Sequence, residues 1–255
     1  MATLSVVTIT LNEEQNIAAC LDSVRWADEV IVLDSGSTDR TVEIAKAYTP
    51  HVLHVQWQGY GGTRNSALQR ATGDWILWLD ADERVTPELA EEIRRMLKSA
   101  DPHVAGFAVA RRAFFLGRWI RHSGWYPSRV VRLFRKSSGL FTETHVHEQL
   151  KIDGPVVNLR HDLLHYTDPD LFHYFAKYNR YTSLAAQDIA SSGRRFSVLD
   201  LLVRPPFLFV KMYILRLGVL DGMEGLILAV VSASYVFTKY AKLWELQFHS
   251  PRRQS

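Results

Sequence analysis

Trp75-Ile-Leu-Trp-Leu-Asp-Ala-Asp-Glu83 is an apolar run that ends abruptly in three carboxylates. The apolar part is too short to form a helix of its own, so it predicts a buried strand. Side chains at positions i and i+2 of a strand point the same way, and just past its end Asp80 and Asp82 can both reach one hard divalent cation, which prefers oxygen ligands. The expected guest of such a site is a phosphate ester that binds the metal.

The composition indicates a folded protein with a substantial core. The chain has 255 residues, of which 47% are hydrophobic and 22% are charged, and these values exclude a disordered chain. Cys20 is the single cysteine, which excludes an internal disulfide framework and fits a reducing compartment. Because the first residues lead directly into a predicted strand, we expect no amino-terminal signal and a catalytic part that stays in the cytoplasm.

Strands and helices alternate over the first hundred residues. Strands are predicted at residues 4–10, 30–33, 52–55 and 75–79. The intervening helices are expected at 12–24, opened by a capping box, at about 39–48, capped by Ser37 or Thr38, at 63–71, and after Thr86-Pro87-Glu88. This order predicts a mostly parallel α/β sheet with helices on both faces. Ligands bind beyond the carboxyl ends of such strands, so the acidic loops at 12–14, 34–39 and 80–83 are expected to converge.

The second half of the chain is basic and then apolar. Antiparallel strands are expected at residues 104–110, 130–134 and 156–159. Eight basic residues and no acidic one lie between Arg111 and Lys136, which indicates an anionic partner, either phosphorylated substrate or lipid head groups. A helix is predicted from Asp170 to Ser191. Three apolar segments follow, at 198–203, 205–220 and 222–246, with a break at Arg204-Pro-Pro.

The apolar carboxyl-terminal region predicts contact with a membrane surface. Residues 225–238 are uncharged, but they are fewer than the roughly twenty residues that a spanning helix needs. Apolar segments with flanking Lys and Arg suit helices that lie in the membrane interface. The alternatives are a helical lid packed on the sheet and an oligomer interface.

Two other site classes are disfavoured by motif spacing. Gly59-Tyr-Gly-Gly62 matches neither the dinucleotide fingerprint nor a phosphate-binding Walker loop, so the acidic strand lacks the partner that an ATPase requires. His147-Glu148 is not followed by a second histidine at the spacing of a zinc protease helix.

Several motifs together carry a family resemblance. They are Thr8-Ile-Thr-Leu-Asn-Glu-Glu14, Val32-Leu-Asp-Ser-Gly-Ser-Thr-Asp39, Arg64-Asn65, Leu79-Asp-Ala-Asp-Glu83, Arg132-Leu-Phe-Arg135, His145-Val-His-Glu148 and Leu217-Gly-Val-Leu-Asp-Gly222. The chain resembles the inverting family-2 glycosyltransferases with the GT-A fold, and among them the lipopolysaccharide core β-glucosyltransferase type. The resemblance covers almost the whole chain and is strongest over the first 150 residues.

The resemblance implies a domain organisation and a set of site residues. Residues 1–165 would form the GT-A catalytic domain, with a nucleotide-binding half at 1–100 and an acceptor and catalytic half at 101–165, and residues 166–255 the interfacial helical region. The residues implied to contact the nucleotide sugar are Asn12, Glu14, Asp34, Arg64 and Asp80. Asp82, with Asp80 as a possible partner, would bind Mn²⁺ or Mg²⁺ at the diphosphate and so stabilise the leaving group. The alternative for Asp34 is a helix-capping turn residue, and the two roles are compatible.

An inverting transfer also needs a general base for the acceptor hydroxyl. The Glu-Asp pair that many members carry in the second half of the fold is missing, so Glu148 is the best candidate and Glu143 the fallback, although Glu148 could form a surface ion pair instead. His145, His147 or His165 could complete the metal shell, as could phosphate and water. Arg129 or Arg132 is expected to meet a phosphate of the donor or the acceptor.

The predicted function is metal-dependent transfer of a hexose, with glucose favoured, from a nucleotide-diphosphate sugar, with UDP favoured. The expected acceptor is lipopolysaccharide core or a similar lipid-linked saccharide at the cytoplasmic face of the inner membrane, and nucleic acid is not an expected partner. One alternative is transfer to a polyprenyl phosphate, an ionised acceptor that needs no base, so retained activity of Glu148→Gln would favour it. Another is a non-catalytic, nucleotide-sugar-binding membrane scaffold, which would bind ligand without turnover.

Overall fold

The computed structural model describes residues 2–55, 59–99, 101–142 and 150–249. Their contacts divide the chain into two compact units. Unit 1 contains Met1–Arg112 and Ser128–His165, and unit 2 contains Ala113–Pro127 and Tyr166–Ser255. The segment Ala113–Pro127 therefore groups with the carboxyl-terminal helices. The functional division into residues 1–165 and 166–255 stays a prediction.

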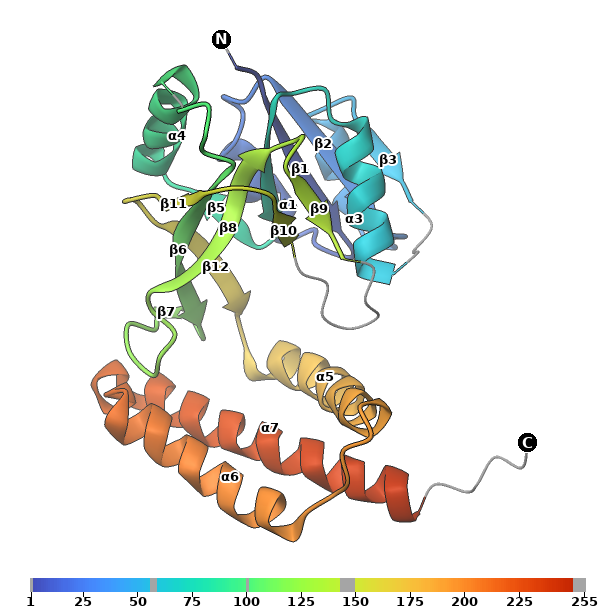
Figure 1. Ribbon diagram of the computed structural model, residues 1–255, viewed down its shortest axis with the longest axis vertical. Coiled ribbons are helices and arrows are strands. Elements are labelled where there is room, and N and C mark those ends of the chain that lie inside the picture. Colours follow the sequence, from blue (N-terminus) through green and yellow to red (C-terminus); the bar gives the residue numbers. More distant parts are fainter. Residues whose placement is uncertain (1, 56–58, 100, 143–149, 250–255) are drawn as a thin grey trace, which may run out of the picture. The chain divides into compact units, whose positions relative to one another are not determined.

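A mixed sheet forms the centre of unit 1 (Figure 1). Its first four strands in spatial order are parallel: β3 (Val52–His54), β2 (Glu29–Asp34), β1 (Leu4–Thr10) and β4 (Trp75–Asp80). The order continues with β8 (Ser128–Arg135), β6 (Gly106–Phe115), β12 (Leu163–Asp168) and β5 (Glu83–Val85). Strand β8 is antiparallel to both β4 and β6. The parallel first half is thus confirmed, and the second half of the sheet is of mixed direction.

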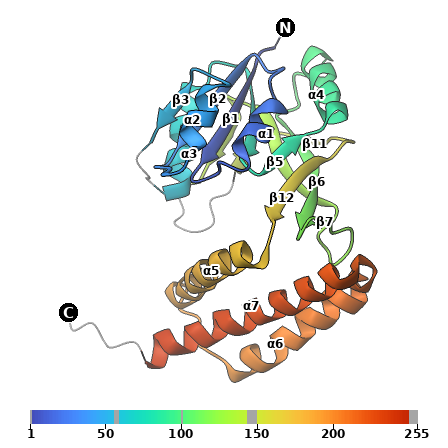
Figure 2. The ribbon, with the colours of Figure 1, turned by 180° about the vertical axis from the view of Figure 1, so that it is seen from behind.

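Helices cover both faces of the parallel strands, as predicted. Helices α1 (Ile17–Asp22) and α4 (Pro87–Ser99) bury Cys20, Leu89 and Ile93 in one core with β1 and β4. Helix α3 (Gly59–Arg70) buries Ala67 and Leu68 in a second core on the other face. Figure 2, the view from behind Figure 1, places α1 and α2 (Thr41–Lys46) in front of the sheet. The cores form because successive side chains of β4 point to opposite faces.

Two predicted helix starts are wrong and one is confirmed. Helix α1 begins at Ile17 and α2 at Thr41, and neither has a side-chain cap from the predicted residues. The predicted capping groups of both helices are instead engaged in bonds between the two loops. Thr86, by contrast, accepts the Leu89 backbone N–H at the start of α4, at 3.2 Å. Gly59–Gly62, expected as a turn, begins α3.

The remaining strands were only partly predicted. Strand β11 (Val156–Asn158) pairs with β6 in the parallel direction, so the predicted antiparallel arrangement is wrong for this strand. Sequence reasoning also missed β12 and four shorter strands, which are β5, β7 (Arg118–Trp119), β9 (Gly139–Phe141) and β10 (Leu150–Ile152). The four shorter strands have two or three residues, which is too short for a periodic pattern to identify.

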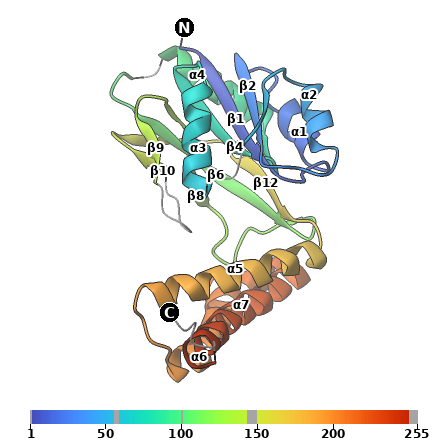
Figure 3. The same ribbon diagram turned by 90° about the vertical axis from the view of Figure 1, so that its right-hand side faces the viewer.

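Three long helices make up most of unit 2, and Figure 3 shows them packed against one another. They are α5 (Leu171–Ser191), α6 (Val198–Val210) and α7 (Gly222–Phe248). A π-helical turn (Lys211–Leu215) and a 3-10 turn (Gly218–Asp221) join α6 to α7. Pro205 and Pro206 lie inside α6, so the predicted break there is wrong: the fixed φ of proline fits a helix, although each proline removes one backbone donor.

The segment Gly218–Phe248 is, within the described part of the chain, the one helical segment long and apolar enough to cross a membrane by length and composition. The mean hydropathy of its most apolar window is 1.5, and 22% of that window is buried within the protein. A core helix of a soluble protein also passes this test, but most residues of such a helix are buried. In this window most residues are not buried.

Candidate active site

The strand register brings the predicted acidic loops to one edge of the sheet. Thr10 at the end of β1 pairs with Asp34 at the end of β2, and the preceding Ile9 pairs with Asp80 at the end of β4. The three strands run in the same direction, so the loops that follow them leave the sheet side by side. This edge is the candidate active site.

Hydrogen bonds join the loop after β1 to the loop after β2. Asn12, which has a left-handed φ of 56°, donates its backbone N–H to Ser37 Oγ at 2.9 Å and accepts the Thr38 N–H on Oδ1 at 2.8 Å. Glu14 accepts the Arg40 N–H at 3.2 Å and donates its own N–H to an Asp39 carboxylate oxygen at 3.1 Å. The two side chains predicted to line the nucleotide pocket therefore hold these loops together. Their contact with a nucleotide stays a prediction.

Asp34 is the anchor of the second loop. Its carboxylate is 3% exposed and accepts the backbone N–H groups of Gly36 and Ser37, both at 3.0 Å. Burial alone would raise the pKa of Asp34, but the hydrogen bonds from Ser37 and Gly36, and from His54, outweigh it and hold the pKa below its ordinary value. Asp34 thus caps its own turn, but α2 begins only at Thr41, so the helix-capping alternative is wrong; a contact with the base or ribose stays a prediction.

An Asp34→Ala variant is expected to lose about 1–2 kcal/mol of unfolding free energy at neutral pH, because two backbone donors lose their acceptor. A carboxylate with a lowered pKa stabilises the folded state above its unfolded-state pKa and loses that effect as the pH falls through the folded-state pKa. The difference between the native protein and the variant should therefore shrink in acid. Urea unfolding across that pH range measures it. Asp22→Ala, at an exposed pair with Arg25, is the control and should change little.

An ionic cluster built on the buried side chains of Arg132 and Glu83 holds the end of β4. The Arg132 guanidinium, from β8, donates to Asp80 Oδ2 and, at 2.6 Å, to Glu83 Oε1. The other oxygen of Glu83 accepts the Asp80 backbone N–H at 3.0 Å. The Glu83 side chain is fully buried and that of Arg132 is 11% exposed. One arginine and one glutamate therefore fix both the backbone and the side chain of Asp80.

Burial and charge together shift the pKa values of Asp80 and Glu83 in opposite directions. Loss of hydration would raise the pKa of Asp80, but the positive charges of Arg132 and Arg64 hold it below its usual range. Burial raises the pKa of Glu83 even though Arg132 opposes that effect. The charge of Arg132 therefore favours the ionised form of both carboxylates.

Two further arginines lie around this cluster. Arg111, from β6, places Nη1 3.9 Å from Glu83 Oε1, and its pKa is lowered by burial and by the charge of Arg132. The Arg64 guanidinium lies over the rings of Trp78 and Phe141, at 5.3 and 5.2 Å from their centroids. Arg64 was predicted to lie near the nucleotide. Arg111 and Glu83 were missed, because the antiparallel pairing that brings β6 and β8 to the end of β4 has no local sequence signal.

Asp82 differs from Asp80 in its surroundings. Its carboxylate is 18% exposed and lies 3.4 Å from Nε2 of His165, with no arginine partner among the described residues. His165 lies on β12 opposite Glu83 of β5. The structure thus places Asp82 next to His165, whereas Asp80 is held by Arg132; a metal site shared by the three residues stays a prediction.

The carboxylates of Asp82 and Asp80 fit a divalent cation that takes most of its ligands from substrate phosphates and water. Within the described ranges, no group of three or more His, Cys, Asp and Glu side chains is arranged around one metal position. The donor set here is a carboxylate, Asp82, with a second, Asp80, two residues earlier. Mg²⁺ and similar ions are often held by one or two carboxylates, with substrate phosphates and water completing the shell. A third protein ligand, His165, stays a prediction.

The other predicted site residues are either engaged with the protein or outside the described residues. Arg129 donates to the Leu159 carbonyl at 3.0 Å, and Arg132 belongs to the cluster above, so a phosphate contact by either stays a prediction. The predicted base Glu148, its fallback Glu143, and the histidines at positions 145 and 147 lie outside the described residues.

Comparisons with known proteins identify the family of this chain and agree with its fold. Residues 5–152 match the family model of glycosyl transferase family 2. The lipopolysaccharide core biosynthesis glycosyltransferase LpsC of Rhizobium meliloti is 32% identical over 250 residues, which cover 95% of this chain and 92% of LpsC. An uncharacterized glycosyltransferase of Rickettsia typhi is 30% identical, over 98% of this chain and 89% of that protein.

A solved structure confirms the GT-A fold. The mannosyltransferase PcManGT of Pyrobaculum calidifontis, determined with GDP-mannose and Mn²⁺, superimposes with a TM-score of 0.55 at 18% identity, covering 95% of this chain and 87% of that one. At this identity the likeness concerns the fold. The family model matches more than half of the chain, and LpsC matches nearly all of it. The chain is therefore a glycosyltransferase and belongs to glycosyl transferase family 2.

Proposed function

We propose that this glycosyltransferase transfers a hexose from a nucleotide-diphosphate sugar to lipopolysaccharide core, or a similar lipid-linked saccharide, with inversion at the anomeric carbon. The observation that carries the proposal is the placement of Asp82 beside Asp80, at the carboxyl edge of the parallel strands in a family-2 chain. The acceptor class is supported by the similarity to LpsC, whose name assigns it to lipopolysaccharide core biosynthesis. UDP and glucose are proposed from the family resemblance.

Asp82 is the proposed principal ligand of a divalent cation, Mn²⁺ or Mg²⁺, with Asp80 and His165 beside it. The bound cation would neutralise charge that develops on the diphosphate leaving group. Asp80 is fixed by Arg132 and Glu83, so the short loop between Asp80 and Glu83 is held at both ends. A loop held in this way presents the Asp82 carboxylate in one position and needs little reorganisation during the reaction.

In the proposed transfer, Glu148 takes the proton of the acceptor hydroxyl. The acceptor oxygen forms the new bond to the anomeric carbon while the bond from that carbon to the diphosphate oxygen breaks, and the nucleoside diphosphate leaves with the electron pair. Attack from the face opposite the leaving group inverts the configuration. Glu148 is proposed from its place in the sequence motif Thr144-His-Val-His-Glu148.

The exposed apolar side chains of unit 2 support a peripheral site of action at the cytoplasmic face of the inner membrane. Leu199, Leu202, Val203 and Phe207 of α6 are 56–71% exposed, and Leu215 of the following turn is 66% exposed. Large apolar side chains that gather on one helix, beside basic residues, are typical of helices that lie in the lipid interface. A lipid-linked acceptor would be presented at that surface.

Calorimetric titration with UDP, GDP and CDP, with and without Mn²⁺, tests the donor site. We expect UDP to bind, Mn²⁺ to tighten its binding by about tenfold or more, and Asp82→Ala to remove the effect of Mn²⁺, because the metal joins the carboxylate to the diphosphate. Failure of every nucleotide to bind the folded protein would contradict the proposal. Nucleotide binding without sugar transfer to any lipopolysaccharide acceptor would favour the scaffold alternative.

A further inference from the structure

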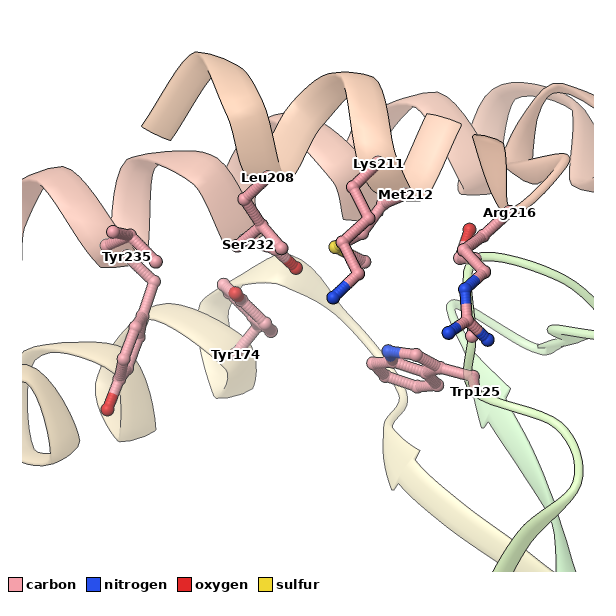
Figure 4. Close-up of a pocket in the computed structure, with 11 residues that line it drawn as sticks. Trp125, Tyr174, Leu208, Lys211, Met212, Arg216, Ser232 and Tyr235 are labelled. Atoms are coloured by element: carbon pink, nitrogen blue, oxygen red, sulfur yellow. The ribbon is translucent and has the colours of Figure 1, made fainter. Parts of the chain in front are cut away.

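A cavity lies within unit 2. Its volume is about 460 Å³, within the range of small-molecule sites. Residues from the loop after β7, from α5, from α6 with its π-helical turn, and from α7 line it, and Figure 4 shows them around the opening. The proposed sugar transfer assigns no role to this cavity.

The walls are aromatic and aliphatic. Trp125, Tyr174, Tyr235, Leu208 and Met212 supply most of the lining side chains. Behind them, the buried Phe115 ring packs edge-on against both Trp125 and Tyr174, at centroid distances of 6.2 and 5.8 Å. Such walls favour a hydrocarbon or a flat apolar group. The packing of Phe115 holds the Trp125 and Tyr174 rings in place.

Two cations share this apolar space. Lys211 and Arg216 line the cavity, and Figure 4 shows both side chains reaching toward the space beside Trp125. The lining contains no aspartate or glutamate, and in the described part of the chain no carboxylate forms an ion pair with either residue. Two cations without a carboxylate partner in one apolar pocket are complementary to a ligand that carries negative charge.

The loop that carries Trp125 is tied to the turn that carries Arg216. The buried Asp221 carboxylate accepts the backbone N–H groups of Arg121 and His122 at 3.1 and 2.9 Å, and lies 3.0 Å from His122 Nδ1. Ser123 donates its N–H to the Arg216 carbonyl at 2.9 Å. This arrangement gives a structural role to the motif Leu217-Gly-Val-Leu-Asp-Gly222, since its Asp221 fixes one wall of the cavity.

The backbone at this junction departs from regular structure. A Cβ atom on Gly218 would lie 2.4 Å from Ser123 Oγ and 2.8 Å from the Met212 carbonyl, so only glycine permits the approach. Ser123 and Leu217 both have left-handed φ values, of 58° and 55°. Lys211 and Met212 belong to the π-helical turn, a rare conformation that is frequent at functional sites. Such local strain is retained where the surrounding structure enforces it.

We propose that this cavity binds an anionic membrane lipid, with the phosphate of the head group between Lys211 and Arg216 and the start of the acyl chain along the apolar wall. Arginine and lysine form charge-assisted hydrogen bonds to phosphate oxygens, and the aromatic wall removes hydrocarbon from water. A free phosphate ion would leave the apolar wall unused. The inference rests on the proposed membrane location and adds to it a specific binding site for an anionic lipid.

Binding of monomeric short-chain lipids to the full chain tests the site without the avidity of a membrane surface. We expect dihexanoylphosphatidic acid to bind about tenfold more tightly than dihexanoylphosphatidylcholine, which has no net charge, and more tightly than inorganic phosphate. The double variant Lys211→Gln/Arg216→Gln should lose the preference for the anionic lipid. Both side chains are exposed, so this variant should fold. Arg180→Gln/Arg195→Gln removes the same charge from exposed positions of unit 2 and should retain the preference.

Three outcomes would overturn the inference. Equal loss of affinity in both double variants would show a diffuse electrostatic effect. Equal binding of the two lipids would show an apolar cavity without head-group recognition, and equal binding of inorganic phosphate would show a site for a soluble anion. Titration of the same preparations with UDP and Mn²⁺ separates this result from the donor site, because a failed lipid site leaves nucleotide binding unchanged.

Discussion

An Asp82→Asn variant is expected to transfer sugar about a thousandfold more slowly than the native protein, because the amide cannot supply the negative charge that holds the cation at the diphosphate. The Asp82 side chain is partly exposed and its closest charged neighbour is His165, so the variant should fold with nearly native stability. The measurement is the rate of acceptor-dependent UDP release at saturating Mn²⁺.

Two matched variants make this result specific. Asp153→Asn changes an exposed carboxylate of unit 1 and should transfer at the native rate. Asp80→Asn should lower both the rate and the unfolding free energy, because Arg132 loses a charged partner. Near-native transfer by Asp82→Asn, together with an inactive but folded Asp80→Asn, would assign the cation to Asp80 and contradict the proposed role of Asp82.

An Arg132→Met variant is expected to lose about 3–5 kcal/mol of unfolding free energy, since it leaves the fully buried Glu83 without its cation. The penalty should depend on pH. Without Arg132, the folded-state pKa of Glu83 rises further above its unfolded value, and an acid with a raised pKa destabilises the folded state except at pH values low enough to protonate it. The deficit should therefore be largest at neutral pH and shrink in acid.

Chemical unfolding at several pH values measures this effect, and a second substitution tests its origin. The double variant Arg132→Met/Glu83→Gln should be more stable than Arg132→Met alone, because no buried charge remains unpaired. Arg129→Met, three residues earlier on β8, removes one bond to the Leu159 carbonyl and should cost about 1 kcal/mol or less. A deficit that is independent of pH and unrelieved by Glu83→Gln would attribute the loss to packing.

Much of the first half of the fold could be predicted because its signals are local. The apolar runs that form β1, β2 and β4 are each followed by turn residues, and alternation with helices requires the parallel direction. That direction by itself places Asp34 and Asp80 at one edge of the sheet. The capping assignments were wrong because Asn12 and Thr38 bond to each other, a pairing between loops that one local window cannot reveal.

The structure brings several of the predicted residues to one edge of the sheet, but their contacts were not predicted, and their roles stay predictions. Arg132 was expected to meet a phosphate because it lies in a basic segment, whereas the structure pairs it with Asp80 and Glu83. That pairing depends on β8 lying antiparallel to β4, and a single sequence carries no signal for which strand lies beside which. The cavity in unit 2 was also missed, since its lining comes from four separate segments of the chain.

The ionic cluster at the end of β4 has a consequence for synthesis of the chain. Asp80 and Glu83 leave the ribosome well before Arg132, so a nascent chain can form the parallel strands while two closely spaced acids still lack their counter-ion. In that interval Glu83 is stable only when it is hydrated or protonated. Addition of β8 places a strand between β4 and β6 and brings Arg132 to the acids, so the strand that joins the two parts of the sheet also forms the ionic cluster of the candidate active site.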